Sequence, residues 1–316
     1  MHTRTEVVPG WPVLADGGSL GAVTGVGVDS RDRLFAFHRA GRVWRDVDGF
    51  DLSPIPHSTV AVFDGSSGIE VEAWGEGIFA MPHGLTIDHE DNVWLTDVAL
   101  QQIFKFSPGG QLLLTVGERG IAGEDTAHFN QPTKVAVAMD GSFYVSDGYG
   151  NSRVMKFAPD GRFLFAWGSK GSGEGQFDLP HAIALDSAGR VYVVDRSNVR
   201  VQIFDAGGRF IGQWTGAALG QPFDIAFGAD GTAFLADGGD ALVVVGPDGS
   251  VTERVGRSGD DDGEFRGAHD VAVARDGSIY AGEIDGRRVQ KFSRITACPP
   301  ESSPSNPSSS TSAAVS

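Results

Sequence analysis

The sequence has one cysteine, Cys298, and a chain with one cysteine cannot form an intrachain disulfide. It has no apolar run near the roughly 20 residues that a membrane-spanning helix needs. Its first residues, Met1 to Pro9, also lack the apolar segment of a signal peptide. These absences predict a cytoplasmic protein that makes no contact with a membrane.

Basic residues are scarce as well. The chain has 25 Lys and Arg against 41 Asp and Glu, which gives a formal net charge of −16. Proteins that bind nucleic acid need a basic face for the phosphates, so this balance argues against a nucleic-acid partner. The acidity itself is typical of solvated surface and says little about a substrate.

Long helical patterns are absent too, and a repeat of short apolar runs takes their place. One run of each unit ends in an acid in units two to six, at Asp97, Asp147, Asp195, Asp237 and Glu283, which are 50, 48, 42 and 46 residues apart, and in His38 in unit one. A period of this size is typical of solenoids and propellers. Each complete unit has four runs rich in Val, Ile, Tyr, Phe and Trp, separated by Asp-Gly-type turns, and such runs predict antiparallel strands.

Six units of four antiparallel strands predict an all-β, six-bladed β-propeller over residues 1–296. An open solenoid is the alternative, but it would expose sheet edges at both ends. The sixth unit lacks a fourth strand, and a strand-like piece, Trp11–Leu14, precedes the first unit. We therefore expect an N-terminal strand to complete the last blade and close the ring. The Ser- and Pro-rich tail, residues 297–316, is expected to be disordered.

Histidine occupies one position of the repeat in every second unit. The position has His83, His181 and His269 in units two, four and six, and Thr24, Thr133 and Phe223 in units one, three and five. It begins the first strand, which is innermost in a propeller, so three imidazoles from alternate blades would converge on the axis. Three histidines with an open fourth position match a catalytic zinc site. A polar lining of the channel is the alternative.

Three residues follow the second strand of their units: Arg39, Tyr149 and Arg196. If these turns open on the metal face, a phenol and two guanidiniums border the metal; otherwise they are ordinary exposed turn residues. The acids that end the runs occur in units with and without histidine, so we expect them to be structural turn residues. An insert in the first unit, Asp46–Ser58, either shapes the mouth of the site or is simply a surface loop.

With these residues identified, the chain resembles the NHL-repeat family, and more closely the peptidyl-α-hydroxyglycine α-amidating lyases, from about Ala22 to Phe292. The matching motifs are Phe37-His38-Arg39 with Val43-Trp44, Pro82-His83-Gly84-Leu85, Trp94-Leu95-Thr96-Asp97-Val98-Ala99-Leu100, Ser146-Asp147-Gly148-Tyr149, Pro180-His181, Asp195-Arg196 and His269-Asp270. That family cleaves an N-acyl-α-hydroxyglycine, a carbinolamide, into an amide and glyoxylate.

The resemblance implies roles for individual residues. The zinc ligands of the family match His83, His181 and His269; its catalytic tyrosine and arginine match Tyr149 and Arg39, and a further active-site arginine matches Arg196. A structural calcium would use the side chain of Asp270 and the backbone carbonyls of Val23 and Leu85. In this scheme zinc binds the substrate hydroxyl, Tyr149 takes its proton, and an arginine holds the glyoxylate carboxylate.

The chain departs from the family at a few positions. Gly267 stands where the family has a methionine, two residues before the third histidine. The pairs Asn130 with Gly150 and Tyr192 with Ile203 replace the disulfide-bonded cysteines of animal members, as expected in a reducing compartment.

The leading hypothesis is therefore a monomeric zinc-dependent carbon–nitrogen lyase with a small-molecule or peptide-derived carbinolamide as its substrate. Another metal-assisted hydrolase in the same channel is one alternative, and a non-enzymatic NHL interaction scaffold is the other.

Overall fold

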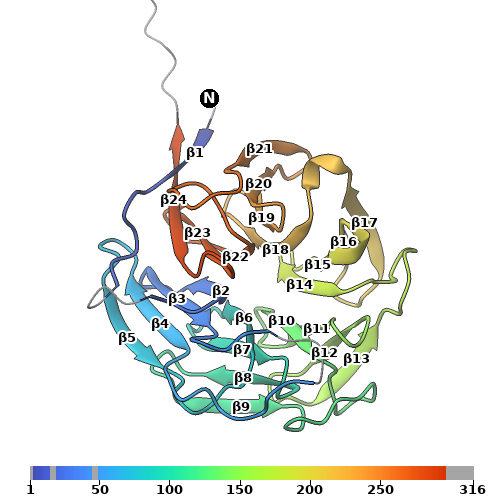
Figure 1. Cartoon of the computed structure of the whole chain (residues 1–316). Helices are drawn as coiled ribbons and strands as arrows, with labels where there is room; N and C mark the ends of the chain where they lie inside the picture. Colours follow the sequence, from blue (N-terminus) through green and yellow to red (C-terminus); the bar gives the residue numbers. More distant parts are fainter. Residues whose placement is uncertain (1–2, 15–18, 45–48, 297–316) are drawn as a thin grey trace, which may run out of the picture.

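The computed structural model describes residues 3–14, 19–44 and 49–296, and these residues form a closed ring of six antiparallel sheets (Figure 1). Each sheet has four strands, so the predicted all-β, six-bladed propeller is confirmed. The described part of the chain contains no helix beyond two short 3-10 turns, Arg196–Asn198 and Ala217–Leu219, and no helix that is long and apolar enough to cross a membrane. The expected disorder of residues 297–316 falls outside the described residues.

The strands follow the chain from the axis outward in each blade. Blade one has β2 (Val23–Val28), β3 (Arg33–His38), β4 (Val60–Asp64) and β5 (Glu70–Trp74); blade two has β6 (Pro82–Ile87), β7 (Val93–Asp97), β8 (Gln102–Phe106) and β9 (Leu112–Val116); blade three has β10 (Pro132–Val137), β11 (Phe143–Asp147), β12 (Arg153–Phe157) and β13 (Phe163–Trp167). Blade four has β14 (Pro180–Leu185), β15 (Val191–Asp195), β16 (Arg200–Phe204) and β17 (Phe210–Thr215); blade five has β18 (Pro222–Phe227), β19 (Ala233–Asp237), β20 (Ala241–Val245) and β21 (Val251–Val255); blade six has β22 (Ala268–Val273), β23 (Ile279–Glu283), β24 (Val289–Thr296) and β1 (Thr3–Val7).

Burial falls from the inner strands to the outer one. All five residues of β7 are buried, whereas β9 alternates between exposed and half-buried residues. The second strands pack between neighbouring blades through large side chains: the rings of Trp94 and Phe143, from blades two and three, lie 4.6 Å apart. This gradient explains why the second run is the most aromatic and β-branched part of the repeat, since those side chains fill the space between blades.

An N-terminal strand closes the ring, as predicted, but it is not the expected segment. β1 pairs antiparallel with β24, with Thr5 opposite Arg294. The piece Trp11–Leu14 instead runs past blade one, where Val13 forms a single parallel bridge to Ile69. Pro12 gives a physical reason, because proline has no N–H to donate to a sheet ladder.

A β-bulge interrupts the first strand of every blade at the position of the histidine column. In blades three, four and six the register shifts between Pro132 and Lys134, Pro180 and Ala182, and Ala268 and Asp270. A bulge sets two residues against one on the neighbouring strand, so consecutive side chains can point to the same side of a sheet. The channel is consequently lined at two successive levels by each inner strand.

Candidate metal centre and active site

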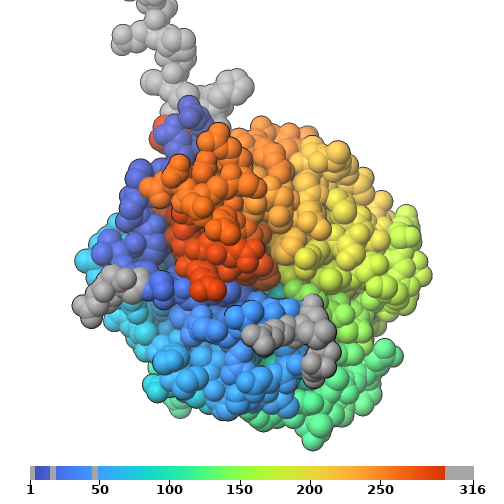
Figure 2. Space-filling view, in the orientation of Figure 1, coloured from blue at the N-terminus to red at the C-terminus, as the bar shows by residue number. Residues whose placement is uncertain are grey.

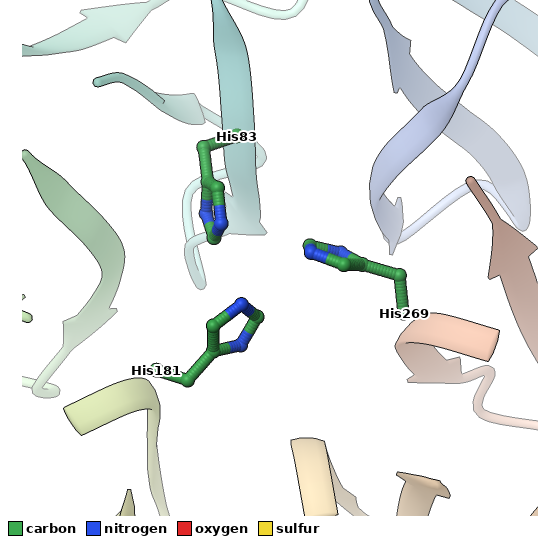
Figure 3. Close-up of side chains that lie close together, drawn as sticks. All are labelled: His83, His181 and His269. Atoms are coloured by element: carbon green, nitrogen blue, oxygen red, sulfur yellow. The ribbon is translucent and has the colours of Figure 1, made fainter. Parts of the chain in front are cut away.

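Three histidines from alternate blades point toward one another at the axis of the ring (Figure 3). His83, His181 and His269 are the second residues of β6, β14 and β22, and all three are buried. Their ring centroids are 4.9 to 5.0 Å apart. One nitrogen of each ring lies within 4.8 Å of the corresponding nitrogens of the other two, a spacing that one metal ion can bridge.

The other ring nitrogen of each histidine bonds to the next blade. Nδ1 lies near the backbone carbonyl at the same repeat position: 2.8 Å for His83 to Thr133, 2.7 Å for His181 to Phe223, and 2.9 Å for His269 to Thr24. A carbonyl oxygen only accepts, so Nδ1 donates its proton and the Nε2 lone pair is directed to the axis. The blades without histidine therefore orient the imidazoles of the blades that have one.

The protonation state of the trio also suits a metal. Burial, with a contribution from the charge of Arg39, lowers the pKa of His83 to about 3. Burial and the neighbouring His83 ring lower the pKa of His181 and of His269 well below the usual value. All three rings are therefore neutral near neutral pH, which is the form that binds a metal ion. Three neutral imidazoles with converging Nε2 atoms fit a zinc ion with one open position.

Tyr149 lies directly over this trio. Its hydroxyl oxygen is 3.1 Å from Nε2 of His83 and 3.1 Å from Nε2 of His181. The turn after β11 reaches this far because Gly148 has no side chain: a Cβ there would lie 2.0 Å from the carbonyl oxygen of Pro180. The glycine thus allows the turn before Tyr149, in blade three, to pass close to the backbone of blade four.

Two arginines flank the phenol on different sides. Arg39 is buried, donates from Nε to the carbonyl of Pro82 at 3.1 Å, and stacks on the ring of Trp44 at 4.9 Å. Burial lowers the pKa of Arg39 to about 10, against opposing contributions from Tyr149 and two carboxylates, so the guanidinium is charged at neutral pH. Arg196 is half-buried and stacks on Phe223, with its central carbon 3.8 Å from the ring centroid.

The first-blade insert contributes to this site. The ring of Trp44 lies 5.1 Å from that of Tyr149, and Phe50 packs on Trp44 at 5.0 Å. Farther along, the Leu52 carbonyl accepts a hydrogen bond from Arg119 of the connector between blades two and three. Figure 2 shows this segment, in blue, on the face of the ring turned to the viewer. Of the insert Asp46–Ser58, the structure describes the part from residue 49 onward.

A cavity of about 900 Å³ opens above the trio. Its lining includes Arg39, Trp44, Tyr149, Arg196, Phe223 and His269. The three side chains predicted from the turns therefore line one cavity with His269, and Tyr149 also contacts His83 and His181. Sequence reasoning gave no role to Trp44 or Phe223; a phenylalanine in the histidine column was the one signal that Phe223 lies beside the axis.

The repeated acids have the structural role that was expected of them. Both carboxylate oxygens of Asp97 are bound by backbone N–H groups, among them those of Met81 and Leu100. Asp147 likewise accepts from the Asn130 N–H and from the Arg153 guanidinium. These buried carboxylates fix the loops between blades and do not face the cavity.

The residues predicted for calcium occupy three different positions of the repeat: Val23 directly precedes the histidine column, Asp270 directly follows it, and Leu85 is two residues beyond His83. Val23 and Leu85 are buried on β2 and β6, two adjacent inner strands. Asp270 directs its carboxylate into the channel, where Oδ2 is 2.9 Å from Nζ of Lys134. Nζ of the same lysine is 2.6 Å from Oδ2 of Asp224.

Comparisons with a family model and with solved structures agree with the propeller fold. The NHL repeat model matches residues 129–157 and 177–204. Among solved structures, streptogramin B lyase has a TM-score of 0.61 at 13% identity and covers 93% of this chain and 98% of its own. A gluconolactonase of Xanthomonas campestris has a TM-score of 0.63 at 13% identity, with 88% of each chain covered. At these identities the two likenesses show the fold alone.

Sequence relatives are more specific. Peptidyl-alpha-hydroxyglycine alpha-amidating lyase 2 of Drosophila melanogaster is 35% identical over 300 residues, which cover 88% of this chain and 72% of that protein. Peptidyl-glycine alpha-amidating monooxygenase A of Xenopus laevis is 36% identical over 301 residues, or 87% of this chain. The match spans about a third of the length of that amphibian relative, 32%. The chain belongs to the family of peptidyl-α-hydroxyglycine α-amidating lyases.

Proposed function

We propose that this chain is a zinc-dependent lyase that cleaves an N-acyl-α-hydroxyglycine into an amide and glyoxylate. The observation that carries the proposal is the Tyr149 hydroxyl, 3.1 Å from the Nε2 atoms of two of the three converging histidines. Membership of the lyase family supports the same reaction. As part of the proposal, residues 1–296 act as one domain, and the chain is a cytoplasmic monomer that takes a small-molecule or peptide-derived carbinolamide.

The reaction transfers one proton and breaks one bond. The substrate hydroxyl loses its proton, the carbon–nitrogen bond breaks with its electron pair going to the amide nitrogen, and the carbon keeps a new C=O bond as glyoxylate. The proton leaves on the amide nitrogen, so atoms and charge balance. His83, His181 and His269 would hold the zinc ion, which would supply a Lewis acid for the hydroxyl oxygen.

The protein side chains carry the other steps. Tyr149 accepts the hydroxyl proton as general base and returns it to the departing nitrogen as general acid. The charged guanidinium of Arg39, whose pKa of about 10 lies well above neutral pH, stabilises the phenolate form of Tyr149. Arg196, packed flat on Phe223, has its guanidinium in the cavity and binds the substrate carboxylate through two N–H groups.

The test is turnover of α-hydroxyhippurate by zinc-loaded protein, with glyoxylate and benzamide measured together. We expect equal amounts of both products from the wild type. Tyr149→Phe should lower kcat by about 100- to 10,000-fold, the usual contribution of a general acid–base group, and should keep its zinc. An exposed histidine, His89, provides the matched control: His89→Ala should retain full activity.

Two results would count against the proposal. Zinc-loaded wild type that releases no glyoxylate above background would rule out the lyase reaction, and hydrolysis of a lactone by the same protein would then favour the metal-assisted hydrolase. Full turnover by Tyr149→Phe would remove the proposed base.

A further inference from the structure

The second level of the channel has its own column of residues. Each directly follows the histidine-column position, and the six are Gly25, Gly84, Lys134, Ala182, Asp224 and Asp270. Three of them are small, two are acids and one is a base. Because a bulge precedes the position in each blade, the charged side chains point into the same channel as the histidines above them.

Lys134 reaches across this channel from blade three. Its Nζ lies 2.6 Å from Oδ2 of Asp224 in blade five and 2.9 Å from Oδ2 of Asp270 in blade six. The three side chains are only 9%, 1% and 3% exposed. The carboxylates also accept backbone hydrogen bonds at 3.0 Å, from Val271 to Asp224 and from Val26 of blade one to Asp270. The ammonium thus joins three of the six blades directly, and the Val26 hydrogen bond to Asp270 adds a fourth.

We propose that the Lys134 ammonium is the resident cation of this level, and that the chain folds without the calcium ion that the family resemblance implies. A calcium ion takes roughly six to eight oxygen ligands at about 2.3–2.6 Å. Asp270 is the one side-chain ligand predicted for it, and both oxygens of Asp270 already accept hydrogen bonds.

The local charge agrees with this assignment. A divalent cation bound to Asp270 would lie beside the Lys134 ammonium and be repelled by it in a site with little water. In the part of the chain that the structure describes, only one oxygen of the two carboxylates, Oδ1 of Asp224, has no hydrogen-bond donor. Two carboxylate oxygens, at 2.6 and 2.9 Å from Nζ, stabilise the charged form of the Lys134 side chain in this buried site.

Removal of the ammonium should leave two buried carboxylates facing each other. Lys134→Met keeps the length of the side chain and removes its charge, and we expect the thermal midpoint to fall by at least about 5 °C. Adding Asp224→Asn to Lys134→Met removes the repulsion and should recover part of the loss. Lys170→Met is the matched control, because the Lys170 side chain is 70% exposed and its ion pair is on the surface.

The direct experiment measures calcium content and thermal midpoint, with no assay of turnover, so it is independent of the proposed lyase activity. Protein is stripped with EGTA, which removes zinc as well as calcium, then dialysed and supplied with zinc or calcium separately. We expect zinc alone to raise the midpoint of the wild type, and elemental analysis before stripping to find no stoichiometric calcium. In Lys134→Met, calcium should raise the midpoint, since the two carboxylates are then free.

Calcium retained at one ion per chain by the wild type, or a midpoint restored by calcium, would overturn the proposal, and neither observation depends on whether Lys134→Met folds. A Lys134→Met midpoint equal to that of the wild type would show that the ammonium is not the cation that holds these carboxylates together.

Discussion

The buried histidines of this chain use their ring nitrogens in two opposite ways. At the axis, His83, His181 and His269 donate from Nδ1 to a carbonyl and direct the Nε2 lone pair toward the axis. His38, buried in blade one, uses Nδ1 as an acceptor for the backbone N–H groups of Ala40, at 3.1 Å, and Gly21, at 3.4 Å. Its proton therefore sits on Nε2, and a second proton on Nδ1 would break both bonds.

His38 makes the fold sensitive to acid. Burial lowers its pKa to about 4, whereas an unfolded histidine has a pKa of about 6.5. Between these values only the unfolded chain binds the proton, so stability falls as the pH falls, by about 1.4 kcal/mol per pH unit from this residue. His38→Asn keeps an acceptor near Nδ1 and does not titrate. We expect denaturant unfolding between pH 6.5 and 4.5 to show a shallower pH slope for the variant than for the wild type.

The pH slope of the variant must be compared with that of the wild type, because the axial histidines also have lowered pKa values and are present in both proteins. His89→Ala, which removes an exposed histidine, should leave the wild-type slope unchanged. Equal slopes for His38→Asn and the wild type would contradict the assignment of acid sensitivity to His38.

Among the elements, the five-residue strand β1 bonds to two different blades. It pairs with β24 of blade six, and Thr5 also bonds to blade five: its N–H and its hydroxyl donate to the Glu253 carboxylate at 3.1 and 2.8 Å. The first strand of the chain thus fastens its last two blades together, across 248 positions of sequence.

Thr5→Val tests this fastening because it keeps the β-branched shape and removes only the hydroxyl. Loss of the hydrogen bond to Glu253 should lower the free energy of unfolding by about 1.5–3 kcal/mol, the range for a bond to a charged group. Arg4, beside it on the same strand, has a side chain 75% exposed, and Arg4→Ala should change stability by less than about 0.5 kcal/mol. Equal denaturant midpoints for Thr5→Val and Arg4→Ala would show that the hydroxyl contributes nothing.

The inner and outer elements differ in how well the sequence predicts them. The second strands, such as β7 and β11, were predicted with their observed bounds, because burial on both faces demands continuous apolar runs. β1 was missed because Thr3–Val7 is an edge strand whose sequence, TRTEV, has little apolar character. The bulges cannot be recognised from the residue types. Side chains normally alternate between the two faces of a strand, so the sequence gave no reason to expect Lys134 in the same channel as its neighbour Thr133.

Two pairs of positions that the family resemblance singles out are neighbours in the fold. Gly150 donates its N–H to the Asn130 carbonyl at 3.0 Å, and Tyr192 faces Ile203 across β15 and β16. These are the positions where animal members of the family have cysteine pairs. Each pair is therefore adjacent in this chain although it has no sulfur to join it.

At the scale of the whole molecule, the symmetry of the ring means that a residue's place in the repeat determines its height in the channel. Residues at one place in the repeat lie at one height in the channel, so His83, His181 and His269 could be brought together from periodicity alone. Trp44 could not be placed in this way. It lies in a loop, outside the strand register that the repeat fixes, and only its contact with Tyr149 shows where its ring points.

The same geometry links metal binding to the integrity of the ring. The three histidines come from blades two, four and six, and each is held by a carbonyl of the following blade, so all six blades must be closed for the nitrogens to converge. A metal that binds only the closed ring stabilises it by mass action, by about 2.7 kcal/mol when the free metal is at about 100 times its dissociation constant.

Removing zinc with a chelator should therefore lower the thermal midpoint, and restoring zinc should return it. His181→Ala should lose this response, whereas His89→Ala should keep it. The thermal midpoint is measured by calorimetry, with the zinc content of each sample measured in parallel. Identical midpoints for stripped and zinc-loaded wild type would mean that the three imidazoles hold no metal in the folded ring.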